Sequence, residues 1–276
     1  MTEAKTSTEL NVGVAGLGTI GLQVAKTLDA ESIPGLRLVG VSSGSLDKAR
    51  QNVASFKSPP EVTDSESLAR TCDIIVECVP KAAFLSVAKH ALQHGCTMIT
   101  VSGAAILANP DIVEDARRHG ARIVLATGAL LGLDAIRAAA EGTIHSAKMK
   151  TRKPPKSLAG APYLEENNID VMSLKTATCI FKGTAAEGAI GFPSNVNVAA
   201  AVGLAGIGAD HTSLEIWCEP EIQRNTHTIA IDADSANFTM TIENVPSEEN
   251  PGTGKITALS VIAALRAETT TLRVGS

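Results

Sequence analysis

The sequence contains no uninterrupted apolar run near the roughly 18 residues needed to span a bilayer, because charges or glycines interrupt every long segment. Its first ten residues, MTEAKTSTEL, contain no apolar stretch of the kind found in secretory signals. These two absences predict a soluble, cytoplasmic protein with no membrane partner.

Basic residues are not in excess either. The chain has 24 Lys and Arg against 29 Asp and Glu, a net charge of -5, and no run of basic residues. Binding along a phosphate backbone depends on such a basic patch or stripe, so nucleic acid is not an expected partner.

The five cysteines are odd in number and widely spaced, with neither a CxxC pair nor a Cys/His cluster at zinc spacing. We therefore expect buried free thiols and no metal site. The cysteines are Cys72, Cys78, Cys96, Cys179 and Cys218.

The length of 276 residues and the hydrophobic content of 44% fit a folded chain of one large or two small domains. In the first part, β-branched apolar runs alternate with helical patterns, and Ile74–Val76 and Met98–Val101 are continuous apolar runs typical of buried parallel strands. The alternation predicts an α/β fold in which residues 1–127 form a Rossmann-type, doubly wound parallel sheet. Its expected elements are strands at NVGVAG, LRLVGVS, DIIVECV, TMITVS and ARIVLAT, and helices near 22–28, 46–56, 83–94 and 111–119.

The pattern changes after residue 127. HTIAIDA and NFTMTIEN alternate apolar and polar residues, which predicts a second, α+β domain with a mainly antiparallel sheet over 128–249. We expect this domain to hold substrate, catalysis and oligomerisation. Residues 151–170 carry three prolines and are predicted to be a loop or edge excursion. Residues 250–276 are predicted to form a helix that returns to the first domain.

A glycine-rich loop gives the clearest chemical signal. Gly16, Gly18 and Gly21 form a GxGxxG motif between the first strand and the first helix, with Thr19 and Ile20 at the helix start. Glycines at this spacing allow a tight turn, close approach of a pyrophosphate and close helix packing, while the helix N-terminus offers free N–H groups to the anion. The motif predicts dinucleotide binding.

The end of the second strand bears on which dinucleotide binds. An NAD site usually places Asp or Glu there to hold the ribose hydroxyls, but this strand ends in Ser42 and Ser43. Small hydroxyl residues leave room for a 2′-phosphate, and Lys48 or Arg50 could supply positive charge. NADP is slightly favoured over NAD; the alternative is that both charges are merely solvated on a helix face.

Several motifs together show a resemblance to one family. They are GLGTIG, TGALLGLDA from Thr127, TRKPP from Thr151, FPSNVNVAA from Phe192 and NTHTI from Asn225. In this order and over nearly the whole chain, they resemble the L-aspartate dehydrogenase family. The resemblance implies that His227 is catalytic, that Ala129 and Asn197 contact the nicotinamide cofactor, and that the protein is a homo-oligomer, with a dimer expected.

The resemblance also implies the reaction. Members of this family oxidise L-aspartate to iminosuccinate, which hydrolyses to oxaloacetate and ammonia, or run in reverse as reductive amination. The sequence departs from the family pattern at the second strand, which lacks an acidic end, and at residues 156–170, which are longer than the family needs.

The chemistry asks for a group that titrates near neutral pH, and histidine is such a group. His227 shares its strand parity with Ile229 and Ile231, which predicts an inward side chain. Taken alone, an inward histidine is more often a hydrogen-bonded core residue than a catalytic one.

A dicarboxylic amino acid also needs cations around its carboxylates. Arg152 and Lys153 are the weaker candidates for substrate binding, although a solvated pair of loop charges fits them equally, and Lys148, Lys150 or Arg224 stay open. His211, beside Asp210, is the only histidine that competes with His227 for a place near the substrate.

Two other functions remain open at this point. One is a related NAD(P)-dependent enzyme acting on a different amino acid, imine or oxo acid, since fold alone does not define the substrate pocket. The other is a non-catalytic dinucleotide-binding sensor. Paired cations around the substrate would separate the first from an aspartate enzyme, and a sensor has no need of His227.

Overall fold

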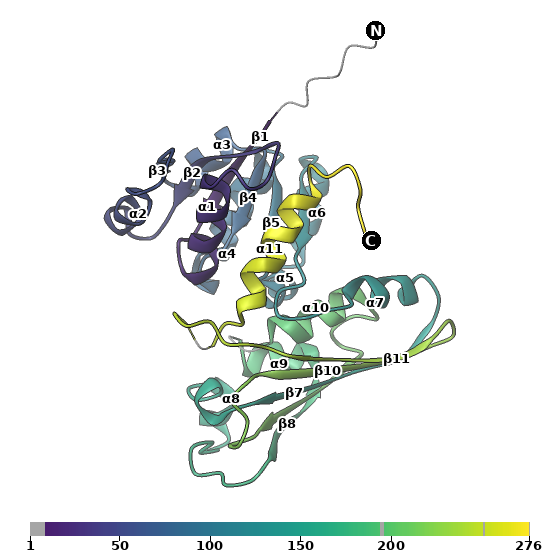
Figure 1. Ribbon diagram of the computed structural model, residues 1–276. Helices are drawn as coiled ribbons and strands as arrows, with labels where there is room; N and C mark the ends of the chain where they lie inside the picture. The colour runs from purple at the N-terminus through teal and green to yellow at the C-terminus, as the bar shows by residue number, and fades with distance from the viewer. Residues whose placement is uncertain (1–8, 194–195, 251, 276) are drawn as a thin grey trace. The chain divides into compact units, whose positions relative to one another are not determined.

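The computed structural model describes residues 9–193, 196–250 and 252–275, and the chain divides into two compact units (Figure 1). The first unit comprises residues 1–102, 109–126 and 258–274, and the second comprises 103–108, 127–257 and 275–276. The main division follows residue 126, next to the expected boundary. Two short pieces differ from the expected ranges: residues 103–108 belong to the second unit, and 250–257 do so as well.

A six-stranded parallel sheet forms the centre of the first unit, which confirms the predicted Rossmann-type fold. Its first strand lies between the second and the fourth, so the strand order reverses there, where dinucleotides bind in such sheets. In spatial order the strands are β3 (Glu61–Thr63), β2 (Leu36–Ser42), β1 (Leu10–Ala15), β4 (Ile74–Glu77), β5 (Thr97–Thr100) and β6 (Arg122–Leu125).

The sequence analysis did not predict β3 or the helix after it. β3 has only three residues and follows two prolines, so it lacks the long apolar run by which its neighbours were recognised. It pairs in parallel with the end of β2 and extends the sheet beyond the glycine loop.

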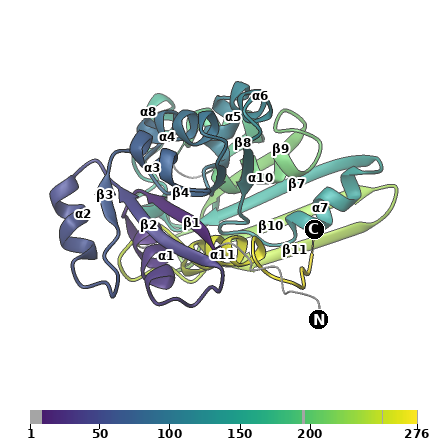
Figure 2. The same ribbon diagram turned by 90° about the horizontal axis from the view of Figure 1, so that it is seen from above.

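Helices cover both faces of this sheet (Figure 2). On one face lie α1 (Thr19–Asp29) and the part of α11 (Lys255–Ala267) that belongs to this unit, whose Val261 and Leu265 are fully buried in the same cluster as Val14 and Val24. On the other face lie α3 (Ser65–Thr71), α4 (Lys81–Gln93) and α6 (Asp111–Arg118), and α2 (Leu46–Val53) follows β2.

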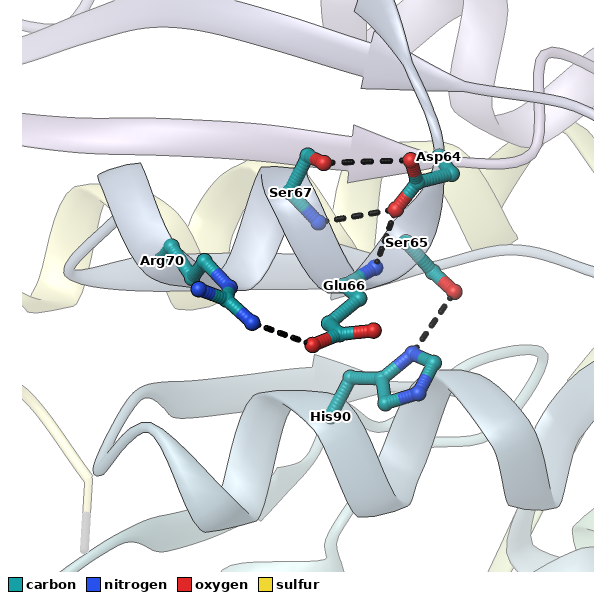
Figure 3. A network of polar contacts seen from close by, with 6 residues as sticks. All are labelled: Asp64, Ser65, Glu66, Ser67, Arg70 and His90. Atoms are coloured by element: carbon teal, nitrogen blue, oxygen red, sulfur yellow. Dashed lines mark hydrogen bonds and ion pairs between the residues drawn. The ribbon is translucent and has the colours of Figure 1, made fainter.

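A capped helix start fixes α3 beside α4 (Figure 3). The Asp64 carboxylate accepts hydrogen bonds from the backbone N–H groups of Glu66 and Ser67 at 2.9 and 2.8 Å, as an N-cap residue does. Ser65 Oγ lies 2.9 Å from Nδ1 of His90 on α4, and Glu66 pairs with Arg70 one turn on. The His90 side chain therefore has a structural contact within the first unit, joining α4 to the start of α3.

The second unit is built on a five-stranded mixed sheet in which only β7 and β9 run parallel, in agreement with the predicted mainly antiparallel sheet. In spatial order the strands are β11 (Asn237–Glu243), β10 (Thr226–Ala233), β7 (Ile144–Lys153), β9 (Thr212–Cys218) and β8 (Thr178–Thr184). On one face of this sheet lie α9 (Ala185–Gly191) and α10 (Asn197–Ala205), and α5 (Gly103–Ala108) and α7 (Leu133–Ala140) pack on α10 (Figure 1).

Burial alternates along the two central strands β7, from Ala147 on, and β10. In β7 the buried residues Met149, Thr151 and Lys153 alternate with outward ones, and in β10 His227 and Ile229 alternate in the same way. The inward set forms the helix-covered face, and this period of two is the pattern expected of a sheet with one solvated side.

The predicted loop over 151–170 is wrong at its start. Residues 151–153 are the last three of β7, because they pair on one side with β10 and on the other with β9. Only at Pro154 does the strand end, since proline offers no N–H to a neighbour. A short 3₁₀ helix (Pro155–Ser157) and α8 (Pro162–Glu166) follow.

Candidate active site

The glycine loop between β1 and α1 is shaped for an anion. Gly16 has φ +93°, and a Cβ there would lie 2.4 Å from the carbonyl oxygen of Cys78; a Cβ on Gly21 would lie 1.9 Å from that of Gly16. Gly18, the N-cap, has open space where its side chain would be, and no side chain caps the helix. The bare N–H groups of α1 and the absence of acidic residues in its first turn suit a pyrophosphate. Thr19 and Ile20 open the helix, as predicted.

Glu77 stabilises the loops beside this one, and the sequence analysis missed it. It is fully buried at the end of β4, where it pairs with Ala15 of β1. Its carboxylate accepts from Val79 N at 2.8 Å and from Thr100 Oγ1 at 2.5 Å, and burial raises its pKa. The signal that could have found it is a single acid inside the apolar run IIVECV, residues 74–79.

At the end of β2, the Ser42 carbonyl accepts a 2.7 Å hydrogen bond from Gly16 N, which joins this strand end to the glycine loop. Ser43 follows, half-buried, and Ser45 caps α2. Lys48 is exposed, whereas Arg50 forms an exposed ion pair with Asp47 at 3.0 Å. The region around Ser43 is therefore small, polar and not acidic.

In the second unit, His227 is 2% exposed and its Nδ1 lies 3.1 Å from Thr151 Oγ1 on the paired strand β7. Burial, and secondarily the charge of Lys153, lowers the pKa of His227 to about 3. The imidazole is therefore neutral at neutral pH, and its burial opposes protonation, which differs from the near-neutral titration expected from the sequence. Thr151 was not singled out from the sequence, because only the strand register shows that it faces His227.

Lys153 lies two residues beyond Thr151 on the same inward face and is 6% exposed. Burial lowers the pKa of its ammonium to about 8. His227 pairs with Thr151, so Lys153 lies two residues from the position opposite His227. A buried cation beside a neutral imidazole is an arrangement that favours an anionic ligand.

Two predicted substrate residues do not join this group. The Arg152 guanidinium forms a bidentate pair with Glu219, with both distances 2.6 Å, and strand alternation places Arg152 on the opposite face from its neighbours. His211 is exposed beside Thr212, which pairs with Ala147. Ala147 lies four positions before Thr151 in β7, which is about 13 Å along the strand.

Ala129 lies in a turn closed by a 3.1 Å bond from Leu130 N to Thr127 O. Its carbonyl accepts a 3.0 Å hydrogen bond from Nδ2 of Asn244, the residue after β11. The backbone N–H of Asn244 in turn donates to Asn225 O at 2.9 Å, two residues before His227. The predicted cofactor residue Ala129 is thus linked to the strand that carries His227.

Asn197 is the first residue of α10 and is exposed. Its Oδ1 accepts a 3.1 Å hydrogen bond from Ala104 N, so it caps α5. Its neighbours Ser194 and Asn195 in the FPSNVNVAA motif lie outside the described residues.

Within the ranges that the structure describes, no helix has the length and apolar character to cross a membrane. In the same ranges, no group of three or more His, Cys, Asp or Glu is placed to hold a metal ion.

The parallel sheet, the anion-binding glycine loop and the buried histidine and lysine define a nicotinamide-dinucleotide-dependent dehydrogenase. Residues 16–126 match the family described as "Homoserine dehydrogenase, NAD binding domain", and residues 134–268 match "Aspartate dehydrogenase, C-terminal". The chain belongs to the L-aspartate dehydrogenase family.

The similarity to relatives of this family extends over the full chain. An L-aspartate dehydrogenase of Bradyrhizobium diazoefficiens is 48% identical over 276 residues, covering 100% of this chain and 98% of the relative. L-aspartate dehydrogenase 3 of Bordetella bronchiseptica is 45% identical, covering 97% and 98%. The crystal structure of aspartate dehydrogenase from Thermotoga maritima has a TM-score of 0.75 at 21% identity, covering 96% and 99%, and so shares the fold.

Proposed function

We propose that this protein oxidises L-aspartate to iminosuccinate, which hydrolyses to oxaloacetate and ammonia, and that it catalyses the reverse reductive amination. The observation that carries the proposal is the pairing of a buried neutral His227 with a buried cationic Lys153 on one sheet face. A dinucleotide sensor would gain nothing from burying these two groups at a cost in stability.

The cofactor, when bound, supplies the hydride acceptor for the Cα hydrogen of the amino acid. Gly16, Gly18 and Gly21 and the start of α1 would hold its pyrophosphate, as their open backbone geometry allows. Ala129 and Asn197 would contact its nicotinamide end, following the family motifs that they match.

His227 acts as the proton acceptor. Thr151 holds Nδ1, which leaves Nε2 as the nitrogen that meets the substrate amine or the water that attacks the imine. Because the imidazole is neutral before the reaction, it can take the proton that must leave when water adds to the imine carbon.

Lys153 binds a substrate carboxylate. Its ammonium is mostly protonated at pH 7, and burial strengthens a charge-assisted hydrogen bond that water would otherwise weaken. Arg152 takes no part, because Glu219 already occupies its guanidinium.

The proposal is tested by following reduced-nicotinamide absorbance with oxaloacetate, with and without ammonia, using NADPH and NADH in parallel. Oxidation that depends on ammonia is the expected result. Consumption of the cofactor with other oxo acids or imines but not with oxaloacetate would assign the protein to a different substrate, and binding without consumption would favour a sensor.

NADP is the slightly favoured cofactor. The end of β2 carries Ser43 in place of an acid, and the exposed Lys48 is available to a 2′-phosphate. We expect Ser43→Asp to lower kcat/KM for NADP by about 10-fold or more and to improve the relative use of NAD, because a carboxylate repels the phosphate and binds ribose hydroxyls. An unchanged ratio of kcat/KM for the two cofactors would remove the phosphate-site argument.

We also propose a homodimer. The helix-free side of the second unit's sheet carries Trp217, with Lys150 Nζ 4.4 Å from its ring centroid, in a setting typical of interface aromatics. Sedimentation velocity would give twice the chain mass if the dimer forms.

A further inference from the structure

Two buried asparagine oxygens have no hydrogen-bond partner among the described residues: Oδ1 of Asn225, two residues before His227, and Oδ1 of Asn244, which faces Gly254. Asn244 is 4% exposed. An unmet buried acceptor is costly and uncommon in a folded protein, so two of them on paired chain segments call for a donor that the described residues do not provide.

The strand register groups these oxygens with the proposed catalytic residues. Asn244 N donates to Asn225 O, so the two stand opposite each other just beyond the Thr226–Glu243 pair. Thr226 also pairs with Arg152 on its other side, which places Asn225 level with Lys153. Both asparagines continue the inward parity of His227 just beyond the strand ends, so their side chains lie on the same face of the sheet as the imidazole and the Lys153 ammonium.

We infer that Asn225 and Asn244 bind the amino group of the substrate through their side-chain oxygens, while Lys153 binds a carboxylate. This inference rests on the proposed function and deepens it: the site would take an α-amino acid rather than a dicarboxylate in general. The amide nitrogen of Asn244 has a second task, since it holds the Ala129 carbonyl at 3.0 Å.

Neutral acceptors suit the chemistry better than carboxylates would. Hydride can leave Cα only after the ammonium has lost a proton, and a carboxylate beside the ammonium would stabilise the charged form and oppose that loss. An amide oxygen accepts a hydrogen bond from either the ammonium or the free amine. The pair can therefore hold the amino group through deprotonation without opposing it.

Asn225→Ala is the variant that tests the inference, because the described contacts of its side chain tie down no other loop. Binding of L-aspartate and of succinate, which has the same two carboxylates and no amine, is measured by titration calorimetry in the presence of oxidised cofactor. We expect the affinity for L-aspartate to fall by about 10-fold or more and the affinity for succinate to stay within about twofold.

Asn244→Ala should show the same selective loss, with an added fall in cofactor affinity from the freed Ala129 turn. Asn237→Ala, at the exposed start of β11, is the matched control and should change neither ligand. Suppose that the wild type binds aspartate more tightly than succinate. If Asn225→Ala then lost affinity for both ligands equally, or for neither, the inference would be overturned. If the wild type bound neither ligand, the proposed function would fail first, and the inference with it.

Discussion

Replacing His227 by asparagine is expected to lower kcat for L-aspartate oxidation by about 10²–10⁴-fold, the usual contribution of a positioned acid–base group. The side chain of asparagine can still bond to Thr151 Oγ1, but it cannot accept a proton at neutral pH. Cofactor affinity should hold, because the hydrogen bonds that hold Ala129 and Asn197 do not involve the His227 side chain and the glycine loop belongs to the other unit. Steady-state kinetics with a parallel cofactor titration separates the two effects.

The same variant should gain resistance to acid. In the wild type, the unfolded chain protonates this histidine below its ordinary pKa of 6.5, whereas the folded chain does not do so until about pH 3. The contribution of this residue to the free energy of unfolding is therefore fully present above pH 6.5. It decreases as the pH is lowered from 6.5 toward 3, by about 1.4 kcal/mol for each pH unit. From pH 7 to pH 5, His227→Asn should thus lose about 2 kcal/mol less than the wild type.

A matched control is His145→Asn, since His145 is an exposed residue at the start of β7. It should change neither kcat nor the acid dependence of unfolding. Retention of more than about a tenth of the wild-type rate by His227→Asn would be inconsistent with acid–base catalysis by this residue.

The sequence was most informative where chemistry and local geometry coincide. The glycines of GLGTIG require backbone conformations that only glycine adopts at low cost, so the motif and its place between strand and helix could be read directly. The parity of His227 with Ile229 likewise predicted the inward side chain that the structure shows. Both inferences depend on neighbours in the sequence.

Residues brought together by register could not be predicted in this way. Thr151 lies 76 positions from His227, and Asn244 lies 115 positions from Ala129. The prolines at 154 and 155 made the whole segment resemble a loop, which concealed that Lys153 ends a strand and is buried while Arg152 is paired outward. The last residues of a strand that ends directly before a proline are hard to recognise from sequence, because the proline makes them resemble the start of a loop.

Lys153→Met is expected to have two large effects of opposite sign. Loss of the buried cation should raise KM for L-aspartate by about 10²–10³-fold, because removing one partner of a buried charge pair costs 2–5 kcal/mol or more. The apoprotein should become more stable at pH 7, since methionine fills a similar volume without a charge. A residue that only supported the fold would give a less stable protein.

The pH dependence identifies the cause of the added stability. The unfolded chain keeps the Lys153 proton up to about pH 10.5 and the folded chain only up to about 8. The cost of burying the charge, about 3 kcal/mol from this difference, is therefore present below pH 8 and is relieved as the pH rises toward 10.5. Denaturant unfolding should show that Lys153→Met is more stable than the wild type at pH 7 and that the difference is small at pH 10.

The matched control is Lys148→Met, at an exposed residue of the same strand, which should change neither KM nor the free energy of unfolding by much. A Lys153→Met protein that is less stable than the wild type at pH 7, with an unchanged KM, would assign this lysine to the fold and leave the substrate carboxylate to another cation.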